Sequence, residues 1–369
     1  MTTTTPHRER PAGLRGTLAR WAGRITTPLV PTDYLDLLDP LGSGTRLRGR
    51  IVAVHAETRD AVTVVIQPGS GWRAHRPGQF LRLGVDVDGV RHWRSYSLTS
   101  VPHRADGCLS ITVKAVSGGL VSGHLARRAT AGTVVHLDQA AGEFTLDDPA
   151  PAKILFLTAG SGITPVMGML RSMAPAVGRD VVVVHSAPSP EDVIFGGELR
   201  MMARRGHIRL IEVHTRAEGR LSPGRLAELV ADVTERQTWA CGPNDFLQTF
   251  EEHWAAMSIT DPGIADRLRT ERFRPALVAI GDGGHVTFSA TGTTVEADGS
   301  QSLLETGEAA GVLMPSGCRM GICFGCVAPL RRGAVRDVRN GALTTATEGD
   351  DVAIQTCISA PAGDCDIDL

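Results

Sequence analysis

The chain has 369 residues, more than a single hydrophobic core usually serves, so two or three domains are expected. Its composition is ordinary for a globular protein, and a formal net charge of −2 gives no reason to expect nucleic acid as a partner. The cysteine count is odd, at seven, and four of these cluster late in the chain, which argues against a secreted disulfide framework.

The first residues, Met-Thr-Thr-Thr-Thr-Pro, lack the apolar core of a signal peptide, and no apolar run has membrane-spanning length. We therefore expect a cytoplasmic location, with contact to a membrane only through a partner. Residues 1–45 are predicted to form an N-terminal extension. Leu14, Leu18, Trp21 and Ile25 recur there at helical spacing among arginines, which predicts a short basic amphipathic helix. Such a helix ordinarily packs on its own protein, and a docking surface for a membrane-bound partner is the alternative.

Residues 46–150 are predicted to form a small antiparallel β-barrel, because short β-branched or alternating runs are separated there by Gly/Pro turns. The predicted strands are Arg48–Ala56, Ala61–Gln67, Gln79–Val87, His92–Thr99, Leu109–Val116 and Thr133–Leu137, with a helix over Ser122–Ala129.

The barrel contains the run Arg94-Ser95-Tyr96-Ser97, in which a guanidinium, a ring and hydroxyls could hold a phosphate and a planar heterocycle. The later run Gly118-Gly119-Leu-Val-Ser122 opens a helix, where free N–H groups favour an anion such as a pyrophosphate. Each motif is weak alone, since a four-residue string occurs by chance and Gly-Gly before a helix also forms ordinary turns.

Residues 151–273 alternate strands with helices, which predicts an α/β domain with a parallel sheet covered on both faces. The predicted strands are Lys153–Thr158, Val181–His185, Arg209–His214 and Gln237–Cys241, and the helices are Pro165–Met173, Glu198–Arg204, Gly224–Val230 and Asp245–Ala256. A polar connection through Asp261, Pro262 and Pro275 is expected to follow.

The first of these strands runs into a turn in which Gly160 and Gly162 permit close backbone approach and Pro165 suits the first turn of a helix. A dinucleotide phosphate could lie over that helix end, although Pro165 replaces the third glycine of the full fingerprint and a plain strand-to-helix turn fits as well. The run Cys241-Gly242-Pro243 places a thiol at the same edge, where a nicotinamide would meet it. A buried thiol beside a turn is the alternative.

Residues 274–369 carry Cys318, Cys323, Cys326 and Cys357 in a C-x4-C-x2-C…C pattern, which is typical of a plant-type [2Fe–2S] cluster. Zinc sites usually have two separate C-x2-C pairs. A zinc ribbon or buried free cysteines are the alternatives. Small residues at Gly317, Gly321 and Gly325 would let the loop point backbone N–H groups at the sulfurs. A hairpin of Val286–Ala290 and Thr294–Glu296 and a helix over Leu303–Ala310 are predicted before this loop.

The order R-x-Y-S, G-x-x-S, G-x-G-x-x-P and C-G-P resembles the ferredoxin–NAD(P)H reductase superfamily over roughly residues 46–273, and the cysteine pattern resembles plant-type ferredoxins. The combination looks like reductase components that drive oxygenases and desaturases. Residues 27–41 are similar to those of actinobacterial-type reductases that serve membrane di-iron acyl-CoA desaturases and alkane hydroxylases. The resemblance implies a multidomain fold with a flavin-binding β-barrel, a nucleotide-binding parallel sheet and a β-grasp ferredoxin domain.

The resemblance also assigns roles to residues. Ser97, Cys241 and Tyr96 would act at the reacting rings, because Tyr96 would pack on the isoalloxazine, Ser97 would bond near its reactive nitrogen, and Cys241 would flank the nicotinamide. The other cofactor-binding residues would be Arg94, Gly119, Ser122, Gly160, Gly162, Thr164, Pro165, Gly242, Glu271 and Phe273, and the metal ligands would be the four cysteines. FAD is expected rather than FMN, because the G-x-x-S segment suits a pyrophosphate.

The expected activity is transfer of electrons from NAD(P)H through FAD and a [2Fe–2S] cluster to a separate oxygenase or desaturase. The coenzyme prediction leans to NADPH, because hydroxyls after His185 and the cations Arg216 and Arg220 could bind a 2′-phosphate, although many relatives carry an Arg where Pro188 stands. One alternative is the reductase of a Rieske-type steroid or aromatic hydroxylase, and another is a redox-sensing module. His55, His75, His185 and His214 are expected to be surface or satisfied core histidines, and Cys108 and Cys365 structural.

Overall fold

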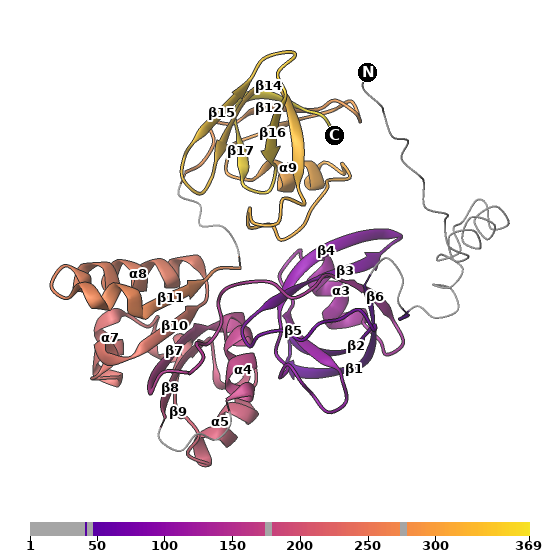
Figure 1. Ribbon diagram of the computed structural model, residues 1–369. Coiled ribbons are helices and arrows are strands. Elements are labelled where there is room, and N and C mark those ends of the chain that lie inside the picture. Colours follow the sequence, from indigo (N-terminus) through magenta and orange to yellow (C-terminus); the bar gives the residue numbers. More distant parts are fainter. Residues whose placement is uncertain (1–40, 43–46, 174–178, 274–278) are drawn as a thin grey trace, which may run out of the picture.

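The computed structural model describes residues 41–42, 47–173, 179–273 and 279–369 (Figure 1). The helix predicted over residues 14–25 and the resemblance over residues 27–41 fall, apart from residue 41, outside the described residues, as does Pro275. No helix in the described part of the chain combines the length and apolar character needed to cross a membrane.

The first domain is an antiparallel barrel, as predicted. Its strand order is β4-β3-β6-β1-β2-β5, and a bridge between Leu98 and Ile111 joins the end of β4 to β5 and closes the sheet. The elements are β1 (Arg48–Thr58), β2 (Ala61–Pro68), β3 (Phe80–Val87), β4 (Val90–Ser97), β5 (Leu109–Lys114), α3 (Leu120–Arg128) and β6 (Val134–Leu137). Alternate apolar side chains such as Leu81 and Leu83 fill the interior.

Strand β4 begins two residues before the predicted start, because the turn of Asp88 and Gly89 has φ values of 49° and 83°. Positive φ at both central residues is the geometry of a tight two-residue hairpin, so Val90 pairs directly with Val87. The hairpin β3–β4 therefore extends further than its apolar pattern indicates.

The second domain is a five-stranded parallel sheet of order β11-β10-β7-β8-β9. Its elements are β7 (Lys153–Ala159), η1 (Gly160–Gly162), α4 (Ile163–Ser172), β8 (Asp180–Ala187), η2 (Pro190–Asp192), α5 (Gly196–Arg204), β9 (Arg209–His214), α6 (Thr215–Glu218), α7 (Pro223–Leu229), η3 (Val233–Glu235), β10 (Gln237–Cys241), α8 (Asn244–Ser258), η4 (Pro262–Arg267) and β11 (Leu268–Glu271). Ile154 and Phe156 pack toward α4 and α5, and Leu155 and Leu157 pack toward α7 and α8. Both faces of the sheet are thus covered, as predicted.

The prediction of a plain polar connection after α8 was wrong for residues 262–271. This segment forms η4 and then β11, which pairs in parallel with β10 from Thr238–Leu268 to Cys241–Glu271. The strand sequence Leu-Arg-Thr-Glu has one apolar residue and lies at an edge of the sheet, so no hydrophobic alternation marked it.

The third domain has the β-grasp arrangement, with α9 packed on a mixed sheet of order β13-β12-β17-β14-β15 and β16 paired to β14. The elements are β12 (Gly284–Phe288), β13 (Thr293–Ala297), α9 (Leu303–Ala309), β14 (Val327–Asp337), β15 (Leu343–Ala346), β16 (Val352–Gln355) and β17 (Ser359–Ile367). Ser302 and Glu305 form a reciprocal capping box at the start of α9. The cysteine loop connects α9 to β14.

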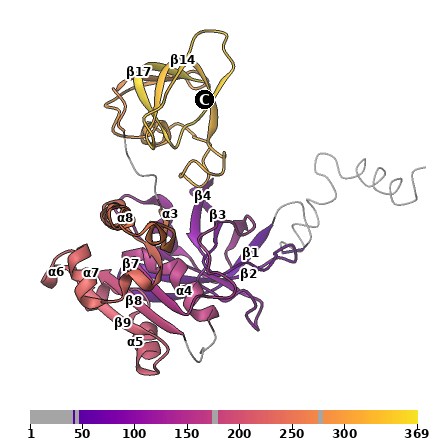
Figure 2. The same ribbon diagram turned by 60° about the vertical axis from the view of Figure 1, so that its left-hand side comes forward.

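The barrel and the parallel sheet lie side by side, and the third domain lies over the hairpin β3–β4 in both views (Figures 1 and 2). Helix α4 packs directly on the barrel backbone: a Cβ atom on Gly168 would lie 2.4 Å from the Leu98 carbonyl oxygen. Arg171, near the end of α4, donates to the Thr99 carbonyl at 2.7 Å. The end of β4 is therefore fixed against the first helix of the second domain.

Candidate functional site

The four predicted metal ligands are arranged as two pairs. The Sγ atoms of Cys326 and Cys357 lie 3.1 Å apart, and the Cys318 backbone N–H donates to Cys323 Sγ at 3.1 Å. Within the described ranges no group of three or more His, Cys, Asp or Glu side chains could hold a metal ion. Three of these cysteines lie in the cysteine loop and Cys357 lies between β16 and β17, and two thiol pairs fit a two-iron centre better than a single-ion site.

Backbone amides of the loop favour the thiolate forms that such a centre requires. Burial opposes ionisation of Cys318, but the N–H groups of Met320 and Ile322 lower its pKa overall. The hydrogen bond from Cys357 lowers the pKa of Cys326 to about 6, while the pKa of Cys357 itself is raised by the same contact. One thiol of this pair therefore ionises first, and a metal would displace the proton that the other retains.

The loop glycines provide the room that the sulfurs need. A Cβ atom on Gly317 would lie 2.4 Å from Cys323 Sγ, and the Gly325 N–H donates to that sulfur at 3.4 Å. Gly321 has a φ of 73°, a conformation that other residues rarely adopt. The donors aimed at sulfur agree with the expectation from the sequence.

The motif Arg94-Ser95-Tyr96-Ser97 occupies the second half of β4. Ser97 is buried, and its hydroxyl has no hydrogen-bond partner in the part of the chain described here. Burial raises the pKa of Tyr96. The pKa of Arg94 is lowered to about 10, mainly by burial and to a smaller extent by the charge of Arg319, so Arg94 remains a cation at neutral pH. A buried hydroxyl without a partner is what a hydrogen-bonding ligand such as a flavin ring would satisfy.

Gly119 is the N-cap residue of α3, and a Cβ atom there would lie 2.4 Å from the Ser122 hydroxyl. That hydroxyl accepts from the Val116 N–H at 3.2 Å. The two residues therefore shape the turn at the start of α3, and no side chain caps this helix end, as an anion site requires.

At the edge of the parallel sheet, Gly160 has a φ of 55° and open space where a side chain would stand. Gly162 performs a packing role, because a Cβ atom there would lie 2.0 Å from the Cys241 carbonyl oxygen. Thr164 is buried and donates to the Ser161 carbonyl at 2.9 Å, and Pro165 lies in the first turn of α4. Gly242 would meet Phe246 at 2.8 Å if it had a Cβ atom.

Cys241 and Glu271 are neighbours across β10 and β11. Burial raises the pKa of the Cys241 thiol well above its usual range and raises the pKa of Glu271 to about 8. Glu271 Oε2 is buried and lacks a hydrogen-bond partner among the residues that the structure covers. Phe273 follows β11 and is 39% exposed. The strand ends thus bring a neutral thiol and a neutral carboxyl together beside the glycine turn.

No sequence pattern indicated the contacts of Arg171 at the junction between the barrel and the parallel sheet. Arg171 binds Glu198 through both Nε and Nη2 while it holds the Thr99 carbonyl, so it clamps α4 to α5 and to the barrel. His185 is buried with Nδ1 at 2.8 Å from the Thr158 hydroxyl, and burial lowers its pKa to about 3. It is a neutral core histidine, but its Nε2 atom has no hydrogen-bond partner in the described part of the chain, whereas a surface or satisfied core histidine was predicted.

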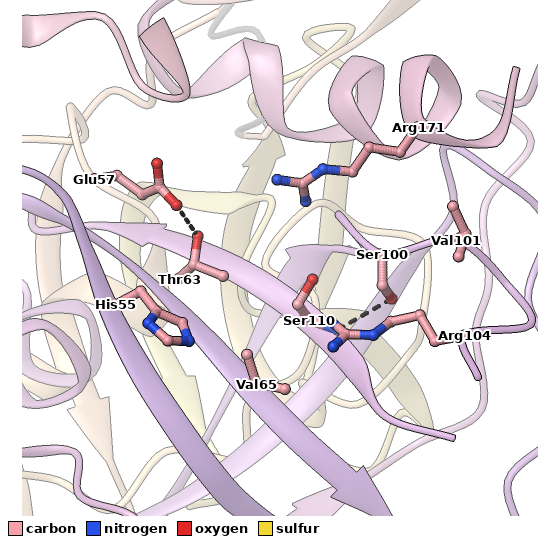
Figure 3. Close-up of a pocket in the computed structure, with 9 residues that line it drawn as sticks. All are labelled: His55, Glu57, Thr63, Val65, Ser100, Val101, Arg104, Ser110 and Arg171. Atoms are coloured by element: carbon pink, nitrogen blue, oxygen red, sulfur yellow. Dashed lines mark hydrogen bonds between the residues drawn. The ribbon is translucent and has the colours of Figure 1, made fainter. Parts of the chain in front are cut away.

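A cleft of about 380 Å³ lies between the outer face of the barrel and the end of α4 (Figure 3). Its lining residues are His55, Glu57, Thr63, Val65, Ser100, Val101, Arg104, Ser110 and Arg171. Both arginines already have carboxylate partners, Glu198 for Arg171 and Asp106 for Arg104. None of the predicted cofactor residues lines this cleft, so it is separate from the candidate site.

Comparison with known proteins was made with this geometry in hand. The oxidoreductase FAD-binding domain matches residues 73–146, the oxidoreductase NAD-binding domain residues 156–252, and the 2Fe-2S iron-sulfur cluster binding domain residues 286–362. The first range contains Arg94–Ser97 and Gly119–Ser122, and the third contains all four predicted cysteine ligands.

Two curated relatives are informative. An NADPH oxidoreductase of Mycobacterium tuberculosis is 47% identical over 95% of this chain and 92% of that protein. The glycine betaine monooxygenase reductase subunit of Pseudomonas aeruginosa is 34% identical over 79% of this chain and 87% of its own length. Among solved structures, phthalate dioxygenase reductase has the same fold, with a TM-score of 0.57, 23% identity and coverage of 88% of this chain and 98% of that one.

Proposed function

The chain belongs to the NAD(P)H-dependent oxidoreductases of the ferredoxin reductase type that bind FAD and carry a C-terminal [2Fe–2S] domain, and we propose that it transfers electrons from NADPH to a membrane di-iron acyl-CoA desaturase or alkane hydroxylase. The observation that carries the electron-transfer proposal is the pairing of four cysteines, within a matched ferredoxin domain, on the same chain as flavin and nucleotide domains. When bound, FAD would supply a carrier that can take two electrons together and release them one at a time.

The residues of the chain then have the task of orientation. In this proposal Arg94 holds the flavin phosphates, Tyr96 packs on its ring, and the Ser97 hydroxyl, which has no partner in the described residues, bonds near its reactive nitrogen. Gly119 and Ser122 present the start of α3 to the pyrophosphate, which favours FAD.

The nicotinamide side is built from the second domain. Gly160, Gly162 and Pro165 shape the turn that receives the dinucleotide, while Thr164, Cys241 and Gly242 line the nicotinamide position. Glu271 and Phe273 close this side of the flavin. Because Cys241 and Glu271 are neutral at pH 7, neither places a charge beside the transferred electrons.

The choice of a desaturase or alkane hydroxylase as partner rests on the resemblance of residues 27–41, within the N-terminal extension, to reductases that serve those enzymes. The match to the mycobacterial NADPH oxidoreductase leaves only about 18 of the 369 residues uncovered, so more than half of the N-terminal extension is shared with it. The oxygenase reductase of Pseudomonas aeruginosa covers only 79% of the chain. We propose that the extension docks on the membrane-bound partner and brings this chain to the membrane surface.

A Rieske-type oxygenase is the second candidate partner. The names of two groups of relatives favour an oxygenase as acceptor, namely glycine betaine monooxygenase reductase subunits and the ferredoxin reductase component of 3-ketosteroid-9-alpha-monooxygenase, which is 33% identical over 79% of this chain. Both candidates require the same flavin and cluster residues, and they differ only in the acceptor.

Reconstitution distinguishes the two partners. Purified protein with NADPH is added either to vesicles that contain a di-iron acyl-CoA desaturase or alkane hydroxylase, or to a purified Rieske oxygenase, and the oxidised products are quantified. We expect product with the vesicles and loss of it when residues 1–45 are deleted, while reduction of cytochrome c by the truncated protein stays unchanged. Turnover with the Rieske enzyme alone would contradict the membrane partner, and no oxidation of NADPH would contradict the reductase itself.

Glu271 gives a prediction for pH. Its pKa is raised by burial from 4.5 to about 8, so the folded protein holds this proton where an unfolded chain would release it. The stabilising effect is complete below pH 4.5 and is lost as the pH rises through about 8. We expect flavin reduction by NADPH to slow above pH 8 in the wild type, as the buried carboxylate forms beside the nicotinamide.

Glu271→Gln should remove this pH dependence and keep the rate at pH 6.5 within about threefold, since an amide resembles the neutral carboxyl. Stopped-flow absorbance of the flavin between pH 6 and 9.5 measures it. Glu252→Gln, on the exposed face of α8, is the control and should retain the wild-type profile. Identical profiles for wild type and Glu271→Gln would show that Glu271 is not the group that titrates.

A further inference from the structure

The face of the barrel that meets the cysteine loop carries an arginine that no cofactor motif includes. Arg82 lies on β3, and its guanidinium lies 5.2 Å above the Trp93 ring and 3.1 Å from the Asp138 carboxylate. Its side chain is 22% exposed. Trp93 itself lies flat on the sheet, because a Cβ atom on Gly84 would be only 3.0 Å from the indole.

This arginine lies beside the cysteine loop at Gly317 and Gly325, two glycines that also lie close to Cys323 Sγ. Arg82 Nη2 lies 3.2 Å from the position of a Cβ atom on Gly317 and 3.4 Å from that on Gly325. The same Cβ positions lie 2.4 Å and 3.4 Å from Cys323 Sγ. Only a glycine therefore separates this cation of the barrel from the sulfur of a predicted cluster ligand.

Two polar groups at this junction are buried without a partner in the described ranges. One is Arg82 Nε, and the other is the hydroxyl of Ser95, which pairs with Arg82 across β3 and β4. Arg82 stacks on Trp93 and pairs with Asp138, and its buried Nε still has no hydrogen-bond partner in the described ranges. Such an arginine can interact with a further negative centre.

The junction also connects the two redox sites. Arg94, proposed to hold the flavin, donates from Nη1 to the Trp93 carbonyl at 2.8 Å. Trp93 supports Arg82, and Arg82 contacts the glycines beside Cys323. The third domain also lies near the start of β4, because the charges of Arg319 and Glu308 act on His92 and Arg94. Arg94, Trp93 and Arg82 therefore link the flavin strand to the side of the barrel that faces the cysteine loop.

Resting on the proposed electron transfer from flavin to cluster, we propose that Arg82 is a positioning residue that docks the cysteine loop on the barrel and whose charge raises the reduction potential of the cluster. A [2Fe–2S] centre with four thiolates is negatively charged, and its charge becomes more negative on reduction. A cation in a partly buried site stabilises the reduced form more than the oxidised form. The same cation, held by Trp93 and Asp138, fixes the loop at one place on the hairpin.

The test compares variants that change the charge in opposite directions. Arg82→Gln removes the cation, and Asp138→Asn removes the carboxylate that partly neutralises it. We expect the midpoint potential of the cluster, from electron paramagnetic resonance during a dithionite titration of the full chain, to fall in Arg82→Gln and to rise in Asp138→Asn. Arg82→Lys should restore the potential. Arg91→Gln, on the same hairpin and paired with Asp86, is the control and should leave it unchanged.

Docking is measured separately, in a single turnover with NADPH. We expect flavin reduction at the wild-type rate in Arg82→Gln and cluster reduction slowed by about tenfold or more, since small misplacements of reacting groups cost rates of this size. Arg82→Lys should recover only part of the rate, because an ammonium cannot stack on the indole in the same way.

Wild-type potential and cluster-reduction rate in Arg82→Gln would overturn the inference, as would shifts of the same sign in Arg82→Gln and Asp138→Asn. Iron content and the resonance line shape show whether the loop remains folded in each variant. Failure of NADPH to reduce the wild-type flavin would instead contradict the proposed function, and the dithionite titration would still decide the role of Arg82.

Discussion

Replacing Cys323 by serine is expected to abolish the cluster signal and electron transfer to one-electron protein acceptors, while ferricyanide reduction by the flavin continues. Cys323 Sγ accepts hydrogen bonds from the N–H groups of Cys318 and Gly325, so this thiolate is held at the centre of the loop. We expect iron content below about a tenth of wild type, because losing a ligand costs more than the roughly 10- to 100-fold in affinity lost when only an outer hydrogen bond is changed.

Ferricyanide reduction should stay within about twofold of wild type, because the barrel and parallel sheet have their own cores and distant changes act independently. The matched control is Cys365→Ala, which alters a buried thiol of the same domain that lies in β17, opposite Val286 and Gly333. Its cluster signal should persist. Loss of both activities in Cys323→Ser would show that the flavin domains do not function without the cluster domain, and an intact cluster would exclude Cys323 as a ligand.

The sequence predicted the parts of this fold in which local pattern and burial agree. The strands β2, β7 and β8 are continuous apolar or β-branched runs, and nearly all of their residues are buried. Strands β14 to β17 were not predicted. The longest of them, Val327–Asp337, contains Pro329, Gly333 and consecutive arginines, so its place in the sheet depends on pairing with β17 and β16 rather than on its own composition.

In the candidate site, too, the features with a local sequence pattern were predicted and the contacts between distant segments were not. The four cysteines and the glycine turns are local patterns, and the structure places them at the loop and at strand ends as expected. The pairing of Cys241 with Glu271 depends on β11, which has no hydrophobic alternation. Arg82 and the cysteine loop are more than 230 residues apart in sequence, and an arginine on a strand is usually just a surface residue. Such a contact exists only once the domains are placed together.

The coenzyme prediction depends on Arg216, the second residue after β9, at the carboxyl edge where the ribose of a dinucleotide binds. Its N–H donates to the Pro188 carbonyl at 3.1 Å, which joins this segment to the end of β8. Its guanidinium is 61% exposed and lies 3.5 Å from Asp192 Oδ2, too far for a strong hydrogen bond. A 2′-phosphate could therefore bind it without displacing a close partner.

Arg216→Ala should lower kcat/KM for NADPH and leave kcat/KM for NADH within about twofold, since NADH has no 2′-phosphate. A hydrogen bond to a charged group contributes about 1.5–3 kcal/mol, which corresponds to roughly a 10- to 100-fold loss. Steady-state ferricyanide reduction with each coenzyme measures both values without involving the cluster. Arg225→Ala, an exposed arginine on α7 paired with Glu228, is the control and should change neither value of kcat/KM.

Because the phosphate contact is a charge interaction, the preference for NADPH should also weaken as salt is raised in the wild type and not in Arg216→Ala. Equal losses with both coenzymes would mean that Arg216 supports the fold of this edge rather than the recognition of the phosphate.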